Sequence, residues 1–444
     1  MTGLAFFLQG RTFRHGVHPD ENKEATCASA IERMPFVDEY LLPLSQHIGA
    51  PSKPLVRAGQ KVERGQVIAE SAGFVSTHLH APVTGTVKAI ELRLAPSGKR
   101  VETVVIAADA YATQKVTPLD VPDPAKADAE ALISAIQRGG LVGLGGAAFP
   151  THVKLKVPKG KRVQFVMLNG CECEPYLTCD HRVMSERAAD VKRGLDLIMQ
   201  VTGAERAYIG IERNKPDAIA ALEKEVDPER VAVVGLQVKY PQGAEKMMIE
   251  AILKKEVPAG GLPLDLEIVV QNVGTAAALA DLFDRGQPLI ERAVTVTGPG
   301  VRRPANVMVP IGTPVKEVLS HCGGLLPEAK QVILGGPMMG NAQKSLDVPV
   351  TKGTSGILVL TRLAKTAPEE PCIRCGRCLE ACPMFLNPSR LAQLSRAELT
   401  DELKEQHVLD CFECASCSFS CPSHIPLVQL IRVGKGLVRQ KDAS

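Results

Sequence analysis

The stretch CIRCGRCLEACP (372–383) and its repeat CFECASCSFSCP (411–422) decide the fold of the C-terminal part of the chain. Each spells C-x2-C-x2-C-x3-C-P. Three thiolates at this spacing face one iron–sulfur cube from a tight loop, while the helix that follows carries the fourth cysteine toward the other cube. Zinc sites rarely use this run of cysteines. The two stretches therefore predict a small unit that holds two 4Fe-4S clusters.

The fourth ligand is expected to be exchanged between the motifs, because each motif sends its last cysteine away from its own loop. One cluster is assigned to Cys372, Cys375, Cys378 and Cys421, and the other to Cys411, Cys414, Cys417 and Cys382. Two adjacent cubes form a one-electron relay, which needs a donor and an acceptor. The rest of the chain should supply at least one of them.

Two helices are expected beside the clusters. Asn387 and Pro388 suit the N-cap and the first position of a helix. Apolar residues recur at helical spacing after each motif: Leu391 and Leu394, then Leu427, Leu430 and Ile431. Such stripes usually belong to a core, so both helices are expected to shield the clusters.

Composition excludes several classes of protein. The 444 residues predict about three domains at roughly 150 residues per domain. Lys+Arg 52 against Asp+Glu 49 leaves a net charge of +3, so no nucleic acid partner is expected. No window approaches 18 consecutive apolar residues, so no transmembrane segment is expected. The 13 cysteines are clustered, which argues against a disulfide framework and for a reducing, cytoplasmic compartment.

A multidomain α/β and α+β fold is predicted before the cysteine motifs. Apolar strand-like runs alternate there with helix-like stretches, which favours a mostly parallel sheet. Strands are expected at 163–169, 207–211, 231–236 and 266–270, and helices from about 129 and at 183–202, 216–226 and 244–255. Residues 291–326 then read as a strand, a Gly-Pro-Gly turn, a second strand and a helix, which predicts a compact α+β unit.

A glycine-rich stretch, GGLVGLGGAAFPTHVKL (139–155), precedes the first of these strands. Glycines let the backbone approach a phosphate or a flat ring, and Lys154 adds a positive charge. The residues alone leave a tight turn and a cofactor loop about equally open. The acidic stretch NGCECEPY (169–176) directly follows a strand, where α/β sheets place ligands, although a solvated turn would read the same way.

The N-terminal part resembles a barrel-sandwich domain of the biotinyl/lipoyl type. The resemblance rests on VRAGQKVERGQVIAE (56–70) and APVTGTV (81–87). Members that carry a prosthetic group attach it to a lysine at a hairpin tip. The corresponding residues 70–74 hold no lysine, so a structural role is expected rather than a carrier role.

From about 130 to 326 the chain resembles the FMN- and NADH-binding subunit of respiratory complex I. The matching motifs are the glycine-rich stretch, N-x-x-E-x-E-P, YIGIE (208–212) and QNVGT (271–275). Residues 291–326 resemble the soluble-ligand-binding β-grasp (SLBB) domain of that family. The chain departs from this pattern at its end, where it has two ferredoxin-type motifs instead of one four-cysteine cluster.

Over nearly its full length the chain is similar to the RnfC family, the C-type subunits of the Rnf complex, which is an ion-translocating ferredoxin:NAD oxidoreductase of the membrane. The order of domains and the stretch YPQGAEK (240–246) add to this resemblance. It implies four domains: a barrel-sandwich domain in 1–115, an FMN/NADH-binding α/β domain in 125–290, an SLBB β-grasp domain in 291–362 and an α-helical two-cluster ferredoxin domain in 366–444. The expected location is the cytoplasmic face of the bacterial inner membrane, as a peripheral subunit.

The resemblance also implies cofactors, partners and site residues. Two 4Fe-4S clusters, FMN and NAD(H) are the expected cofactors, and the partners are the other Rnf subunits, NADH and, indirectly, ferredoxin. FMN would contact Gly143, Gly145, Gly146, Lys154, Asn169, Asn272 and Thr275, and the nicotinamide nucleotide would lie near Glu172 and Glu174, with Phe149 stacked on it. No residue is assigned as a catalytic acid, base or nucleophile.

Two alternatives remain open at the level of sequence. Cys171, Cys173, Cys179 and His181 lie within eleven residues and offer a separate metal site, although no C-x2-C pair occurs among them. The chain could also be an iron–sulfur relay or adaptor without NADH chemistry of its own. The intact glycine-rich stretch with Lys154 favours the enzyme.

Overall fold

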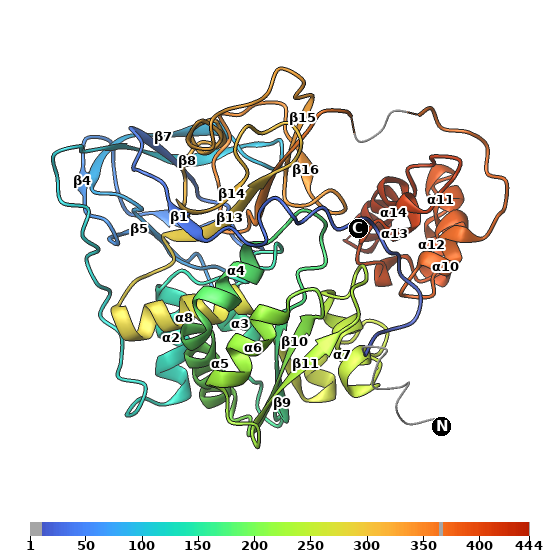
Figure 1. The fold of residues 1–444 in the computed structure, drawn as a ribbon, viewed down its shortest axis with the longest axis horizontal. Helices are drawn as coiled ribbons and strands as arrows, with labels where there is room; N and C mark the ends of the chain where they lie inside the picture. Colours follow the sequence, from blue (N-terminus) through green and yellow to red (C-terminus); the bar gives the residue numbers. More distant parts are fainter. Residues whose placement is uncertain (1–10, 364–366, 444) are drawn as a thin grey trace.

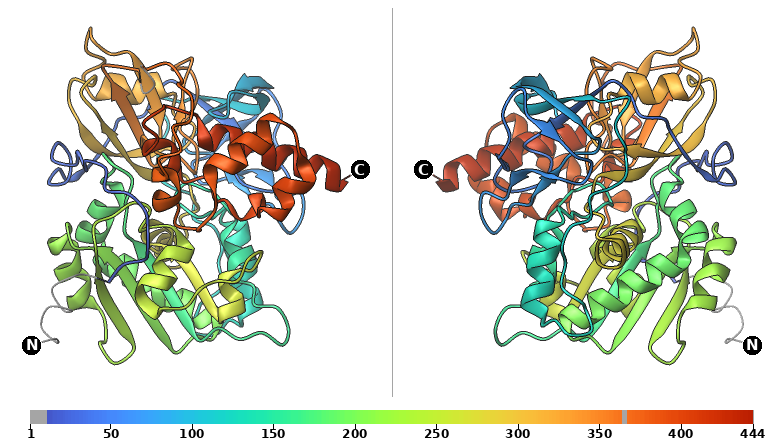
Figure 2. Two further views of the ribbon diagram at one scale, coloured as in Figure 1. Left: turned by 90° about the vertical axis from the view of Figure 1, so that its right-hand side faces the viewer. Right: turned by 90° about the vertical axis from the view of Figure 1, so that its left-hand side faces the viewer.

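The computed structural model describes residues 11–363 and 367–443 (Figure 1). Residues 1–10, 364–366 and 444, which include the predicted start of the first and of the last domain, lie outside the described residues. Three β-containing units form one body, and a helical unit lies beside it at the end of a linker (Figures 1 and 2).

The α/β unit is built on a parallel four-stranded sheet, as predicted. Its order is β11 (Val231–Leu236), β10 (Arg206–Glu212), β9 (Phe165–Gly170) and β12 (Ile268–Asn272). Alternate residues of β9 pack on opposite faces: Val166 and Leu168 join the core under α5 (Ala188–Thr202) and α8 (Val273–Arg285), and Met167 joins the core under α7 (Glu245–Leu253). The carboxyl ends of the strands point toward the helical unit and toward the sheet that the chain forms after residue 290 (Figure 1).

The helices of this unit lie close to their predicted positions, with one difference. α2 (Ala129–Arg138) and α6 (Pro216–Glu225) agree with the prediction, and α3 (Thr151–Leu155) forms the end of the glycine-rich stretch. The predicted helix at 183–202 is wrong as a single element, because the chain breaks at Arg187, where φ is −128°. The break separates α4 (Cys179–Glu186) from α5 and lets α4 start beside the acidic stretch.

The barrel-sandwich unit consists of two small antiparallel sheets. Their strands are β2 (Glu39–Pro43), β8 (Arg100–Ala108), β7 (Gly85–Leu94) and β4 (Lys61–Val62) in one sheet, and β3 (Lys53–Pro54), β5 (Val67–Glu70) and β6 (Leu79–His80) in the other. The hairpin tip between β5 and β6 packs on the α/β unit. The carbonyl oxygen of Phe74 lies 2.6 Å from Nε2 of His152, and the two rings are in T-shaped contact. These contacts fit a structural role for the tip.

The third unit, the β-grasp unit, is a six-stranded mixed sheet that carries α9 (Val315–His321). Its order is β1 (Ile31–Arg33), β14 (Ala305–Pro310), β13 (Glu291–Thr297), β17 (Gly356–Leu360), β15 (Gln331–Leu334) and β16 (Asn341–Ala342). The strand–turn–strand–helix order predicted for 291–326 is present as β13, β14 and α9. β1 comes from the N-terminal segment, so that segment joins this sheet.

The C-terminal unit is helical. Its helices are α10 (Arg377–Ala381), α11 (Pro388–Arg396), α12 (Thr400–Glu405), α13 (Ser416–Phe419) and α14 (Leu427–Ala443). The Asn387 side chain caps α11 by accepting a hydrogen bond from Arg390 N, as predicted. Leu427 packs in one cluster with Cys378, Cys417 and Cys421, so α14 shields the cysteines. Among the described helices, none has the length and apolar character needed to cross a membrane.

Candidate functional site: a flavin pocket and two cysteine sets

The glycine-rich stretch forms a loop held from three sides. Gly143 N donates to Phe149 O at 2.8 Å and closes the loop at its base. Leu144 N donates to the Thr275 hydroxyl at 2.9 Å, and Arg292 donates to Leu144 O at 3.2 Å. Because the backbone around Leu144 is fixed in this way, the next glycines are exposed at the tip of the loop.

Two predicted asparagines lie opposite each other at the carboxyl edge of the parallel sheet. Asn169 lies near the end of β9 and is the register partner of Asn272 on β12. The Asn272 side chain caps α8 by accepting from Gly274 N at 2.8 Å and Thr275 N at 3.3 Å, and its amide donates to Asp180 at 2.6 Å. The sheet edge and the positive end of α8 therefore meet beside the glycine loop.

The two predicted glutamates brace neighbouring elements. The Glu172 carboxylate accepts from Asp180 N at 2.7 Å and His181 N at 3.2 Å, which caps α4. The Glu174 carboxylate accepts from Met338 N at 3.1 Å and Met339 N at 2.8 Å, which ties the acidic stretch to the β-grasp unit. Burial raises the pKa of Glu174 to about 7, against the opposing effect of these two hydrogen bonds.

A buried lysine from the N-terminal segment fixes the acidic stretch. Lys23 Nζ donates to Glu172 O and Glu174 O, each at 2.9 Å, and to Leu177 O. Burial lowers the pKa of this ammonium group, and the negative charge of Glu172 opposes that effect. Three carbonyl oxygens of the turn are therefore satisfied by one side chain about 150 residues away in sequence.

These elements enclose a cavity of about 420 Å³. Five of the predicted residues line it: Gly145, Asn169, Glu172, Glu174 and Asn272. Its far wall is formed by Asp410 and Phe412, which flank Cys411 in the second cysteine motif. A second cavity of about 510 Å³ adjoins it, shares Gly145 and Glu174, and adds Gly146.

The other predicted flavin and nucleotide residues support the walls instead of lining the cavities. Thr275 is fully buried and holds the glycine loop, and Gly143 closes the base of the loop through the Phe149 carbonyl. Lys154 forms an ion pair with Glu245, which lines the first cavity. The structure therefore places Gly143, Phe149, Lys154 and Thr275 one layer behind the residues that line the cavities.

The structure brings together the cysteines of each predicted set. A cavity of about 320 Å³ is lined by Cys372, Cys375, Cys378 and, from the other motif, Cys421. In the second set, burial and then the neighbouring thiols of Cys414, Cys411 and Cys382 raise the pKa of Cys417. Each set thus includes the last cysteine of the other motif, and thiolates gathered in this way fit iron–sulfur cubes.

The alternative metal site does not assemble among the described residues. Cys171 Sγ donates to Gly210 O at 3.7 Å, Cys173 Sγ accepts from Gly243 N at 3.2 Å, and His181 Nε2 is 2.7 Å from an Asp217 oxygen. The side chains of these three residues point to three different partners.

The sequence of the chain matches curated proteins over nearly its whole length. It is 46% identical to the C-type component of the proton-translocating ferredoxin:NAD(+) oxidoreductase complex of Clostridium ljungdahlii, over 90% of this chain and 88% of that protein. It is 45% identical to the Na(+)-translocating counterpart of Acetobacterium woodii, over 96% of both chains. The chain belongs to the RnfC family of ion-translocating oxidoreductase complexes. The resemblance to this family is thereby confirmed.

Four known domains match this RnfC-family chain in the expected order. They are the RnfC barrel sandwich hybrid domain (11–111), the Nuo51 FMN-binding domain (136–281), the SLBB domain (293–342) and a 4Fe-4S dicluster domain (370–425). The predicted fold class and the FMN and iron–sulfur cofactors are confirmed. A solved NAD+-reducing NiFe hydrogenase shares the fold at 19% identity, with a TM-score of 0.50 over 72% of this chain and 63% of that chain.

Sequence reasoning missed several residues around the pocket. Tyr240 and Glu245 line it, and both belong to YPQGAEK, which served only as a family motif. Asp180 follows the acidic stretch closely but received no predicted role. Lys23 carries no sequence signal, because a lone lysine is normally a solvated side chain.

Proposed function

We propose that this RnfC-family chain exchanges electrons between NAD(H) and membrane partners through three sites in a row: the flavin pocket, the second cysteine set and the first. One observation carries this order. Asp410 and Phe412 line the flavin pocket, and Cys411 lies between them in the chain. The set with Cys411 is therefore called the proximal set, and the set with Cys372 the distal set.

The pocket fits FMN in size and in the chemistry of its walls. Ligand pockets span about 300–1,000 Å³, and this one has about 420 Å³. Gly145 presents backbone without a side chain, and the amides of Asn169 and Asn272 offer donors and acceptors at the carboxyl edge of the sheet. When bound, FMN supplies the exchange between a hydride pair and single electrons, and the clusters supply one-electron transfer.

The protein's own residues would orient and enclose this chemistry. Thr275 and Arg292 fix the glycine loop through their hydrogen bonds to the Leu144 backbone, and Lys23 fixes the acidic stretch. Nicotinamide nucleotide is assigned to the adjoining cavity, because that cavity shares Gly145 and Glu174 with the flavin pocket. A nicotinamide ring in the adjoining cavity would then lie next to the flavin pocket at Gly145.

The distal set is proposed as the contact with membrane partners. Cys372 and Cys375 are exposed, as is Ile373 between them, with 69% of its surface accessible. An exposed cluster can exchange electrons with another protein that docks on it. We assign these partners to other subunits of the Rnf complex at the cytoplasmic face of the inner membrane, with ferredoxin reached only through them.

Anaerobic reduction by NADH tests the proposal. The full chain, prepared without oxygen, should contain about one FMN and eight iron atoms, and NADH should bleach flavin and cluster absorbance together. Bound flavin and iron with no bleaching would support the adaptor instead. Zinc or free thiols in place of iron would overturn the cluster assignment.

A further inference from the structure

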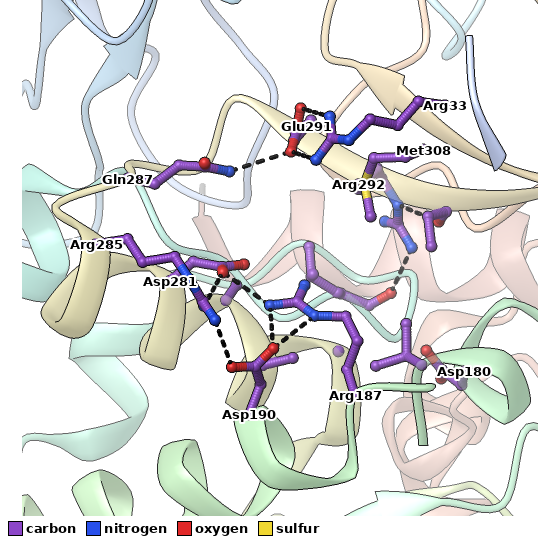
Figure 3. Close-up of a pocket in the computed structure, with 16 residues that line it drawn as sticks. Arg33, Asp180, Arg187, Asp190, Asp281, Arg285, Gln287, Glu291, Arg292 and Met308 are labelled. Carbon is purple, nitrogen blue, oxygen red and sulfur yellow. Dashed lines mark hydrogen bonds and ion pairs between the residues drawn. The ribbon is translucent and has the colours of Figure 1, made fainter. Parts of the chain in front are cut away.

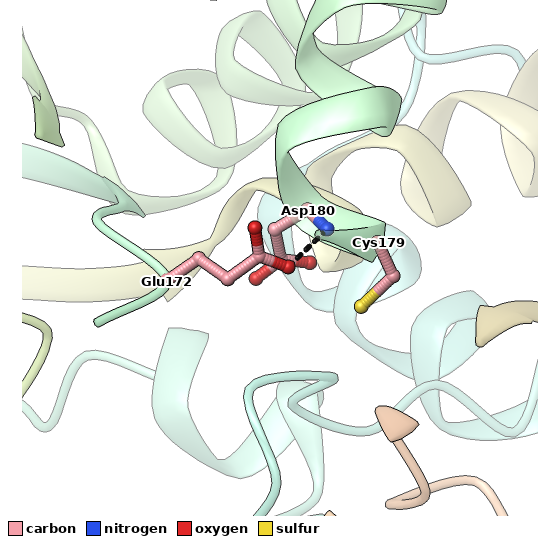
Figure 4. Close-up of side chains that lie close together, drawn as sticks. All are labelled: Glu172, Cys179 and Asp180. Carbon is pink, nitrogen blue, oxygen red and sulfur yellow. Dashed lines mark hydrogen bonds between the residues drawn. The ribbon is translucent and has the colours of Figure 1, made fainter. Parts of the chain in front are cut away.

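Two acidic side chains meet at the wall of the flavin pocket, Glu172 and Asp180 (Figure 4). A carboxylate oxygen of each and the Cys179 sulfur all lie within 4.8 Å of one another. The Glu172 carboxylate is occupied by two backbone N–H groups of α4, whereas Asp180 accepts from the Asn272 amide at 2.6 Å. The negative charge of the Glu172 carboxylate disfavours ionisation of the Asp180 carboxyl beside it.

Asp180 also lines a further, highly charged cavity of about 290 Å³, here called the charged cavity (Figure 3). Only Asp180 and Leu144 line both this cavity and the flavin pocket, among the residues described around them. The charged cavity is walled by ion-paired side chains, including Arg187 with Asp190 and Asp281. The side chains of Arg33 and Arg285 at its rim are 65% and 52% exposed, so water can enter from the surface.

We infer that Asp180, backed by Glu172, is the proton-transfer residue of the flavin site, and that the charged cavity supplies its proton from solvent. The inference rests on the proposed flavin site. A hydride brings one proton and two electrons, so complete reduction of a flavin takes up one more proton. With FMN bound, the Asp180 O–H bond would break with its electron pair staying on the carboxylate, and the proton would pass to a ring nitrogen of the flavin. Water in the cavity then returns a proton to the carboxylate.

The surroundings of Asp180 favour a carboxyl that keeps its proton to a higher pH than an ordinary aspartic acid does. Burial, and next the charge of Glu172, raise its pKa to about 7. The charged and titratable groups that face it come from several elements: Glu172 after β9, Cys179 on α4, Arg187 before α5, Lys215 before α6 and Arg292 on β13. The Arg292 guanidinium donates to backbone carbonyls, and no ion pair of Asp180 is found among the described residues.

The variant Asp180→Asn keeps the shape and removes the proton. In stopped-flow reduction of the FMN-loaded chain by NADH at pH 7, it should slow flavin reduction by about 10²-fold. The wild-type rate should fall as pH rises through about 7, because the acid form is lost, and the variant should lose this dependence. Asp217→Asn is the control and should behave like wild type. Asp217 contacts His181, which lies on the same helix as Asp180, but Asp217 lines neither the flavin pocket nor the charged cavity.

Infrared spectroscopy of the flavin-free chain gives a readout that needs no turnover. The protonated carboxyl band that titrates near pH 7 should contain both Asp180 and Glu174 in wild type and in Asp217→Asn, and it should lose the Asp180 contribution in Asp180→Asn. Glu172→Gln removes the neighbouring negative charge and should move the titration to lower pH. An unchanged band in Asp180→Asn, or wild-type flavin reduction by that variant, would overturn the inference. A wild-type chain that binds no FMN would instead overturn the proposed function.

Discussion

The two cysteine sets share one spacing but occupy different surroundings. In the proximal set, Cys382, Cys414 and Cys417 are buried, whereas in the distal set Cys372 and Cys375 are exposed. The motif fixes which cysteines gather, but it does not fix what each cluster faces. That is decided by how the helical unit docks on the rest of the chain.

The helical unit meets the rest of the chain at a small apolar contact around Tyr240. Its ring packs with Val17, Ala381 and Cys414, and its hydroxyl donates to Cys414 O at 2.8 Å. The N-terminal segment holds Tyr240 in place through two backbone hydrogen bonds with Val17, at 2.8 and 2.9 Å. These contacts hold the proximal set beside the flavin pocket, while the distal set lies at the surface.

The largest expected effect comes from removing one cysteine of each set in separate variants and comparing the two. Cys414→Ala should remove the proximal cluster and abolish NADH-driven reduction of the distal one, because the middle site of the row is lost. Cys375→Ala should remove the distal cluster but leave bound flavin and NADH-driven reduction of the proximal cluster. Electron paramagnetic resonance after NADH addition, with iron and flavin analysis, measures both. Equal behaviour of the two variants would contradict the proposed order.

The exchange of the fourth ligand predicts a crossed loss. Cys421 belongs by sequence to the second motif, whose other three cysteines are in the proximal set. Cys421→Ala should nevertheless remove the distal cluster, because Cys421 lines the cavity with Cys372, Cys375 and Cys378. Cys382→Ala should do the reverse. The spectrum of the remaining cluster identifies which one is lost, and uncrossed losses would show that each motif binds its own cube.

Much of this arrangement was accessible from sequence, and the reason differs between regions. The cysteine sets follow from a spacing within twelve residues, and the parallel sheet from apolar runs of strand length, both local signals. The pocket walls depend on contacts between distant segments, such as Lys23 with Glu172 or Arg292 with Leu144. No periodicity records such pairs, so the sequence does not show that Phe149 and Lys154 lie behind the residues that line the two cavities.

A substitution of Lys23 tests the wall of the flavin pocket, which the proximal set faces and the distal set does not. Lys23→Met keeps most of the length of the side chain but leaves three turn carbonyls without their donor. It should lower the free energy of unfolding by about 1–3 kcal/mol and weaken FMN retention. Denaturant unfolding and flavin content measure these effects, with the exposed Lys99→Met as control. Both clusters should still assemble, because the change lies outside the helical unit.

The smallest effect is expected at the contact that distinguishes the two sets. Tyr240→Phe removes one hydroxyl and leaves Cys414 O without its donor in a buried site. It should lower the free energy of unfolding by about 0.5–1.5 kcal/mol. Since hydrogen bonding near a cluster tunes its potential, the midpoint potential of the proximal cluster should shift while that of the distal cluster stays constant.

Tyr208→Phe provides the matched control for this last change. Tyr208 lies on β10 and its ring contacts Phe165, with centroids 5.5 Å apart, away from both cysteine sets. It should leave both potentials unchanged. A shift of both clusters in Tyr240→Phe would mean that the whole helical unit has moved. A shift of neither would mean that burial alone, without this hydrogen bond, makes the proximal surroundings differ from the distal ones.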